Sequence, residues 1–311
     1  MELLVFHLPY SKAGLEVIKK YYSIFDLIIP AWLEVAGDGR IRTHEDAGII
    51  QQYMSKEKII PMVQNLNLSG QVSNELVKDQ EAVNRFILES LSYLKKRGYK
   101  ELCLDIEGVR YENKERYTDF IGRIAENLHG AGFSLSISIP AKTGNSKDST
   151  WSGAYDYNLL GKIVDRIIIM AYDFHWPGGP PGPIAPINWL QDVIDYAIIE
   201  IPLEKIYFAL GLYGYDWPLN QEERGRGLVY RQIEELARKY KREIEWDQES
   251  RSPYLKYELN GVEHEVWFEN RCSIESKLKL LKEFQLRGVV FWRPGQEDPE
   301  VWELFKGKLL N

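Results

Sequence analysis

Short apolar runs alternate with amphipathic segments from one end of the chain to the other. Each run is continuous rather than alternating in polarity, which is typical of parallel strands that are covered on both faces. The runs that predict strands are Leu3–Leu8, Leu27–Trp32, Ile59–Gln64, Leu102–Ile106, Leu135–Ile139, Ile167–Ala171, Ile206–Leu212 and Gly288–Trp292. The segments that predict helices are Asn74–Lys96, Asn113–Gly130, Asn188–Ile199, Ile274–Leu286 and Pro299–Leu309.

This order of elements predicts an α/β fold, a (β/α)8 TIM barrel, rather than an open doubly wound sheet. The rhythm breaks once, between the seventh and eighth predicted strands. There, Asn260-Gly261 is a strong hairpin-turn signal between Tyr254–Leu259 and Glu263–Phe268. We expect residues 1–219 and 272–311 to form the barrel, and residues 220–271 to form a small α+β insertion that walls the cleft.

Composition narrows the class of protein. The formal net charge of -7 gives no basic footprint for a nucleic-acid partner, and no apolar run approaches the length of a membrane span. The two cysteines and five histidines show no metal-ligand spacing, so we expect neither a metal nor a cofactor. Nine Trp and 19 Tyr suit a cleft that stacks sugar rings, although aromatic residues are also ordinary core filler.

The end of the fourth predicted strand carries the candidate chemistry. Catalytic groups of a barrel lie where its strands end, and alternation along a strand places Cys103, Asp105 and Glu107 on one face. Two neighbouring carboxyl groups inside a barrel are costly unless one keeps its proton. A protonated Glu107 would suit glycoside cleavage, which needs an acid for the leaving oxygen. No second catalytic carboxylate stands out at a comparable strand exit, which leaves room for a nucleophile supplied by the substrate.

The same residues resemble family 18 glycoside hydrolases, the chitinase-like barrels. Asp105-x-Glu107 is similar to the end of that family's Asp-x-x-Asp-x-Asp-x-Glu signature, and Met170-Ala-Tyr172-Asp173 is similar to its Met-x-Tyr-Asp. Tyr213-Gly214 and Trp292 match the ends of the family's strands seven and eight. Several loops also resemble the spore-cortex-lytic N-acetylglucosaminidase branch: Ser138–Thr143, Trp151–Tyr157, Tyr172–Pro186, Tyr213–Trp217 and His264–Glu269.

The resemblance implies a role for each matching position. Glu107 would act as general acid and then base, and Asp105 would orient the substrate's 2-acetamido group, whose oxygen attacks the anomeric carbon. Tyr172 would donate its hydroxyl to that oxygen. Three residues, Asp173, Met170 and Tyr213, would line the site, and Trp292 would form its floor. The partner implied is an N-acetylated glycan, either peptidoglycan or a chitin oligosaccharide.

Several readings stay open. Lys100 and Cys103 replace the first and middle Asp of the signature, which implies an altered pH dependence; Cys103 is either a small core residue or, as a sharper alternative, a nucleophile. Trp176 could stack a sugar or pack within its loop, and Asn65 could bond substrate. A chitinase and a non-catalytic glycan-binding barrel are the alternative functions, the presence of Glu107 arguing against the second. The N-terminal apolar run is too short for a signal peptide, so we expect a protein that is spore-associated or cytoplasmic at synthesis.

Overall fold

The larger of two β-sheets organises the molecule. In this computed structural model, which describes residues 1–44, 47–145, 147, 149–220 and 224–305, that sheet has ten strands. They are β1 (Glu2–His7), β2 (Leu27–Pro30), β3 (Leu33–Val35), β4 (Ile41–Thr43), β5 (Met62–Asn65), β6 (Glu101–Asp105), β7 (Ser134–Pro140), β8 (Arg166–Met170), β9 (Ile206–Gly211) and β15 (Gly288–Trp292). Their order across the sheet is β2-β1-β15-β9-β8-β7-β6-β5-β3-β4.

The sheet curls on itself as in a TIM-like barrel. Its neighbouring strands run parallel, apart from the antiparallel pair β3 and β4. The second predicted strand is divided into β2 and β3, and Ile28 forms a parallel bridge with Ile59. The amide of Ile60 also donates to the carbonyl of Ile28 at 2.9 Å, so β2 meets the segment that leads into β5.

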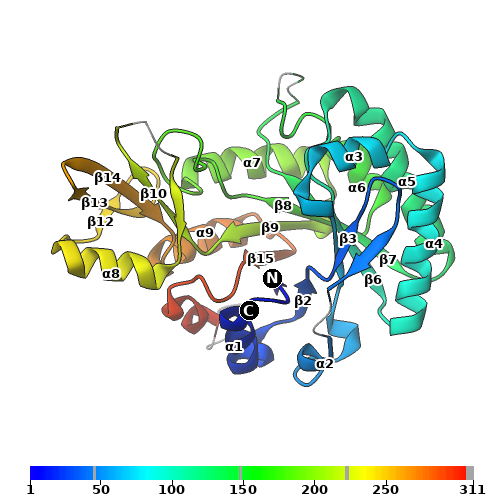
Figure 1. Ribbon diagram of the computed structural model, residues 1–311, viewed down its shortest axis with the longest axis horizontal. Coiled ribbons are helices and arrows are strands. Elements are labelled where there is room, and N and C mark those ends of the chain that lie inside the picture. The colour runs from blue at the N-terminus through cyan, green and yellow to red at the C-terminus, as the bar shows by residue number, and fades with distance from the viewer. Residues whose placement is uncertain (45–46, 146, 148, 221–223, 306–311) are drawn as a thin grey trace.

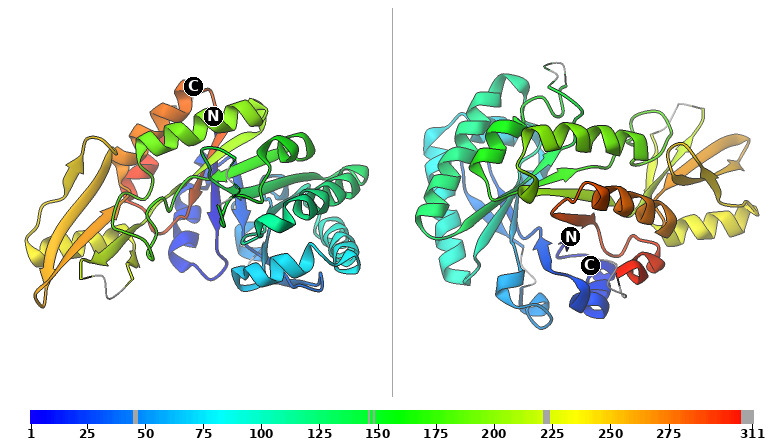
Figure 2. Two further views of the ribbon diagram at one scale, coloured as in Figure 1. Left: turned by 90° about the horizontal axis from the view of Figure 1, so that it is seen from above. Right: turned by 180° about the vertical axis from the view of Figure 1, so that it is seen from behind.

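Helices cover the outside of this sheet (Figures 1 and 2). They are α1 (Lys12–Tyr21), α2 (Ala47–Ile50), α3 (Gly70–Leu76), α4 (Gln80–Arg97), α5 (Lys114–Gly130), α6 (Tyr157–Ile163), α7 (Ile187–Glu200), α8 (Tyr230–Tyr240) and α9 (Arg271–Glu283). Of these, α8 packs on the smaller sheet. Among the described residues, no helix has both the length and the apolar character needed to cross a bilayer.

Two predicted helices differ from those observed. The segment Asn74–Lys96 is interrupted, because Asp79 caps α4 by accepting the amides of Glu81 and Ala82 at 2.9 and 3.2 Å. The last segment forms a 3-10 helix over Pro299–Phe305, and the remainder of the predicted helix, to Leu309, lies outside the described residues.

Apolar side chains are divided between the two faces of the curled sheet. Leu3 and Val5 of β1 belong to the outer core under the helices, whereas Leu4 and Phe6 belong to an inner cluster. This alternation is what a pleated strand that is buried on both faces requires. Tyr172 and Trp292 are partly buried members of the inner cluster, so they lie at its open end.

A second, antiparallel sheet precedes β15 and lies to one side of the larger sheet (Figure 1). Its strands are β10 (Gly214–Pro218), β11 (Arg226–Leu228), β12 (Glu245–Asp247), β13 (Ser252–Leu259) and β14 (Val262–Phe268), in the order β11-β10-β14-β13-β12. Asn260 and Gly261 connect β13 to β14 with φ of 53° and 81°, as a two-residue hairpin turn requires. The sheet begins at Gly214, ahead of the expected boundary at residue 220, and residues 221–223 lie outside the described part.

Candidate active site

The carboxyl end of β6 places two acids inside the curled sheet. Leu102, Leu104 and Ile106 pack in the outer core, while Cys103 belongs to the inner cluster. Asp105 shares the inward face and is only 4% exposed. Its Oδ2 accepts a hydrogen bond from Gln64 Nε2 at 2.9 Å, whereas Oδ1 has no hydrogen-bond partner among the described residues.

This environment keeps a proton on Glu107. Burial raises the pKa of Glu107 to about 8, with further contributions from the negative charges of Asp105 and Asp173. Burial also raises the pKa of Asp105, and the hydrogen bond from Gln64 opposes that rise. Because desolvation and like charge both penalise ionisation, Glu107 is a carboxylic acid that can donate its proton near neutral pH.

Tyr172, which follows β8, brings a hydroxyl donor to these acids. Burial raises its pKa well above the ordinary phenol value, and Asp105, Glu107 and Asp173 raise it further through their charges. The hydroxyl therefore stays protonated, as an oxygen that stabilises a polarised carbonyl must be. The ring lies 6.3 Å from that of Tyr213 in an edge-on arrangement.

Asp173, which was expected to line the site, is a further carboxylate close to Glu107. It follows Tyr172 with a left-handed φ of 58°, and its charge contributes to the raised pKa of Glu107. Its Oδ1 accepts hydrogen bonds from the hydroxyls of Tyr213 and Tyr215, the latter at 2.9 Å. A side chain held by two phenols suits a fixed electrostatic role better than the attack expected of a nucleophile.

Trp292 ends β15 and closes the inner cluster from above. Its ring meets Phe6 edge-on, with centroids 5.5 Å apart, and Tyr172 packs against the same cluster. Met170, the last residue of β8, is 8% exposed. The curled sheet thus gathers one set of expected residues at its open end: Asp105, Glu107, Met170, Tyr172, Asp173, Tyr213 and Trp292.

Asn65 is buried against the backbone of Glu107 and does not lie at the open end of the curled sheet. It is fully buried, its Oδ1 accepts the amide of Glu107 at 2.9 Å, and its Nδ2 donates to the carbonyl of Ser69 at 3.0 Å. Both ends of the side-chain amide are therefore engaged with backbone. The expected bond from Asn65 to substrate is replaced by a contact that fixes the Glu107 backbone.

Other buried polar groups hold the loop after β6. Ser73 Oγ donates to the carbonyl of Glu107 at 2.6 Å, and Asn74 Nδ2 donates to the carbonyl of Gly108 at 2.9 Å. From the opposite side, the Tyr155 hydroxyl donates to the carbonyl of Ile106 at 2.9 Å. The sequence analysis assigned no role to these three positions, although Tyr155 lies in the quoted loop Trp151–Tyr157, because each acts through a backbone group that is distant along the chain.

Trp176 packs against its own loop. It is 50% exposed, its ring lies against Gly178 and Gly179 within its own loop, and the Arg224 guanidinium lies 5.9 Å from the ring centroid. Cys103 is fully buried below Asp105, and burial raises the pKa of its thiol to about 12. A thiol that stays protonated is a poor nucleophile, which favours the reading of Cys103 as a small core residue.

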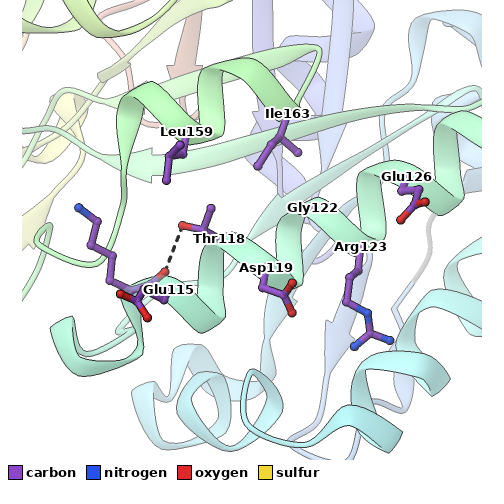
Figure 3. Close-up of a pocket in the computed structure, with 9 residues that line it drawn as sticks. Glu115, Thr118, Asp119, Gly122, Arg123, Glu126, Leu159 and Ile163 are labelled. Carbon is purple, nitrogen blue, oxygen red and sulfur yellow. Dashed lines mark hydrogen bonds between the residues drawn. The ribbon is translucent and has the colours of Figure 1, made fainter.

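A surface groove of about 480 Å³ lies elsewhere, between α5 and α6. Figure 3 shows Thr118 of α5 pointing toward α6, and Leu159 and Ile163 of α6 pointing toward α5, with the Thr118 hydroxyl bonded to the carbonyl of Lys114. No expected site residue lines the groove. It is a depression between two covering helices and has no contact with the acids at the end of β6.

Glycoside hydrolases with a barrel fold have their catalytic groups at the strand ends. The protonated acid, buried carboxylate and phenol at the strand ends of this curled parallel sheet match that arrangement. The chain belongs to the family described as glycosyl hydrolases family 18, which it matches over residues 17–297. The family expected from the strand-end motifs is thereby confirmed.

Relatives narrow the comparison. The chain is 32% identical over 280 residues to the cortical fragment-lytic enzyme of Bacillus anthracis, covering 87% of this chain and 65% of that protein. It therefore spans less than two thirds of that relative's length. The crystal structure of the Bacillus megaterium spore cortex-lytic enzyme SleL matches with a TM-score of 0.88 and 27% identity, covering 98% of this chain and 73% of that one. A chitinase from Chromobacterium violaceum shares the fold, with a TM-score of 0.88, 24% identity and coverage of 97% of this chain and 98% of that one.

Proposed function

We propose that this chain hydrolyses the β-1,4 bond that follows N-acetylglucosamine in peptidoglycan of the spore cortex. The observation that carries the proposal is the raised pKa of Glu107, which sits beside Asp105 and Tyr172 at the strand ends. The names of the relatives, a cortical fragment-lytic enzyme and a spore cortex-lytic enzyme, support the choice of polymer and of a spore-associated role.

The mechanism follows from which groups can give and accept protons. Glu107 donates its proton to the leaving oxygen and, once ionised, activates the water that completes hydrolysis. The free Oδ1 of Asp105 accepts the N–H of the substrate's acetamido group, and Tyr172 donates to its carbonyl oxygen. Held in this way, the acetamido oxygen attacks the anomeric carbon, and the configuration is retained after two inversions.

The proposal extends to the architecture around the site. We infer a (β/α)8 barrel in which the second sheet and α8 form an insertion that walls the cleft. A pocket of about 470 Å³ supports this arrangement, because Phe174 and Trp189 line it together with Asp247 and Glu249 from the second-sheet region. Phe174 and Trp189 lie 5.0 Å apart between ring centroids, an apolar face of the kind that sugar rings stack on.

The experiment is a parallel digestion of purified cortex peptidoglycan and chitin pentamer, with mass spectrometry of the new reducing ends. We expect cortex fragments that end in N-acetylglucosamine. Products from chitin alone would instead identify a chitinase. Binding to either polymer without any product would identify a non-catalytic glycan-binding barrel.

A further inference from the structure

The charges at the open end of the curled sheet pose a question about substrate. Asp105 and Asp173, when ionised, place negative charge beside the protonated Glu107, so a ligand that carries a carboxylate would meet a repulsive field unless a cation faced it. Two cationic side chains follow barrel strands closely, Lys142 after β7 and Arg293 after β15. They differ in whether their donors are already engaged.

Lys142 is committed to the protein. Its Nζ donates to the carbonyl of Tyr155 at 2.7 Å and to Asn145 Oδ1 at 3.0 Å, and it lies 4.7 Å from the ring centroid of Tyr157. The residue is 6% exposed. Its donors therefore stabilise the loop that carries Tyr155, and they do not face a ligand.

Arg293 directly follows the floor residue Trp292 and is half-buried. Its Nη1 donates to Ser11 Oγ at 3.1 Å, and within the described ranges no carboxylate forms an ion pair with it. Burial lowers its pKa, while the nearby Tyr10 has the opposite effect. A guanidinium has five donors in a planar fork, so most of them remain available here.

Other arginines of the molecule, both the shielded Arg166 and the more exposed Arg226 and Arg287, are paired with carboxylates. Arg166 bonds Glu101 at 3.1 Å, and Arg226 bonds Asp216 at 2.8 Å. At the opposite end of β15, Arg287 pairs with Glu2. A half-buried cation without such a partner is costly, unless a ligand provides the anion.

We propose that Arg293, with Ser11 and Tyr10, forms a subsite for a carboxylate carried on an ether substituent of the sugar next to the one seated on Trp292. This inference rests on the proposed function and deepens it. In peptidoglycan, N-acetylglucosamine alternates with a sugar whose lactyl ether ends in a carboxyl group or in a peptide; chitin has no such group. Arg293 would thus select muramyl chains over chitin through a charge-assisted bond.

The surroundings suit an anion of this kind. Ser11 caps α1, its Oγ accepting the amide of Gly14 at 3.1 Å, so the guanidinium lies at the positive end of a ten-residue helix. Tyr10 is 78% exposed and offers an open ring beside the charge. The strand pairing of β1 with β15 keeps this corner next to the inner cluster.

The test measures binding by calorimetry in a Glu107→Gln background, so that turnover does not interfere. The ligands are a tetrasaccharide with free lactyl carboxylates, the same tetrasaccharide with those carboxylates amidated, one carrying short peptides with free carboxyl ends, and chitotetraose. Arg293→Gln is compared with Arg293→Lys, and with Arg231→Gln as a charge-matched control whose side chain is 85% exposed on α8.

We expect Arg293→Gln to weaken binding of the free-carboxylate ligand at least about tenfold more than binding of chitotetraose, with Arg293→Lys intermediate. A similar selective loss of affinity for the peptide-bearing ligand would mean that Arg293 also binds the peptide carboxylate. Equal losses on all ligands, or equal affinity for the amidated and acidic forms, would overturn the subsite.

Failure of the subsite and failure of the proposed function give different results. If the Glu107→Gln protein binds chitotetraose but no muramyl ligand, the carboxylate subsite and the choice of peptidoglycan are both wrong, while a hydrolase acting on chitin remains. If it binds none of the four ligands, the proposed glycan substrate itself is wrong. Thermal melts of all variants exclude misfolding as the cause.

Discussion

At the scale of single residues, the chemistry depends on two acids that water cannot fully solvate. Asp105 is almost fully buried, and one of its oxygens accepts a hydrogen bond from Gln64. Glu107 has the higher pKa because the negative charges of Asp105 and Asp173 add to the effect of burial. The arrangement is unfavourable for folding, because a buried carboxylate is costly to ionise. The same cost keeps the proton where glycoside cleavage needs it.

This cost predicts a pH-dependent difference in stability. The pKa of Glu107 is raised in the folded state, so the stability it contributes is full below its ordinary pKa of 4.5 and is lost as the pH rises toward about 8. We expect Glu107→Gln to melt near the wild type at pH 4 and above it at pH 8, by roughly 2 °C for each kcal/mol gained.

Differential scanning calorimetry across that pH range provides the measurement. The matched control is Glu112→Gln, whose side chain is 64% exposed and which should shift little at any pH. A melting difference for Glu107→Gln that does not change with pH would show that this carboxyl group is not perturbed in the folded protein.

Cys103 gives a second prediction. The buried thiol is neutral at ordinary pH, so it adds no negative charge beside Asp105, whose acidic neighbour is Glu107. A carboxylate in Cys103→Asp would repel Asp105 and raise its pKa. The acid and base limbs of the kcat/KM profile should therefore lie closer together in Cys103→Asp than in the wild type.

Full pH profiles of both proteins on one soluble substrate decide this, with Cys103→Ser as the neutral control. Profiles of wild type and Cys103→Asp that overlay would mean that the thiol is simply core packing without influence on the acids.

At the scale of elements, the loop after β6 is clamped from both sides. Asn65 at the end of β5 and Ser73 in α3 hold the two backbone groups of Glu107, and Tyr155 holds the carbonyl of Ile106. Gly70 and Gly108 allow close contact, since a Cβ at Gly108 would lie 2.7 Å from the Gly70 Cα. The position of the acid is therefore set by neighbouring elements as much as by β6.

Asn65→Ala should reveal this positioning role. Loss of the amide leaves the buried N–H of Glu107 without its acceptor, which costs about 1–3 kcal/mol of folding stability. We expect kcat to fall about tenfold with a smaller change in KM, because a small displacement of a catalytic group slows the chemical step.

The control is Asn127→Ala on the exposed side of α5, where kcat should be unchanged. A rise in KM at constant kcat for Asn65→Ala would instead indicate that Asn65 binds substrate directly.

The clamp marks the limit of what the sequence could predict. The inward alternation of Cys103 and Asp105 follows from the period of a strand and was predictable, as was the Asn260-Gly261 turn. The helix break at Asp79 could also have been predicted, since an Asp followed by Gln80 and Glu81 is a helix-start signal. The contacts of Asn65, Ser73 and Tyr155 could not be predicted from the sequence, because they join residues that are brought together only by folding.

At the scale of the whole molecule, the second sheet is a separately stabilised unit next to the curled sheet. Asp216 is fully buried there and accepts bonds from Arg226, Tyr257 and His264, the last two at 2.7 and 2.9 Å. This network joins β10, β11, β13 and β14. In the proposed arrangement, where this sheet walls the cleft, the network would limit which polymers can lie across the site.

The mechanism as a whole predicts the stereochemistry of the product. Attack by the acetamido oxygen and then by water inverts the anomeric carbon twice, so the first-formed product should be the β-anomer. A substrate from which the acetyl group has been removed lacks the nucleophile and should not be cleaved. Proton NMR of the earliest product is the measurement, and an initial α-anomer would exclude the mechanism.

The most direct test of the account is the hydrolysis rate of Glu107→Gln on one soluble N-acetylated oligosaccharide, measured together with its affinity for that ligand. The amide has nearly the same shape but cannot donate the catalytic proton. We predict a loss of turnover of about 10²-fold or more, with oligosaccharide affinity retained. Near-normal turnover in this variant would contradict the assignment of Glu107 as the proton donor.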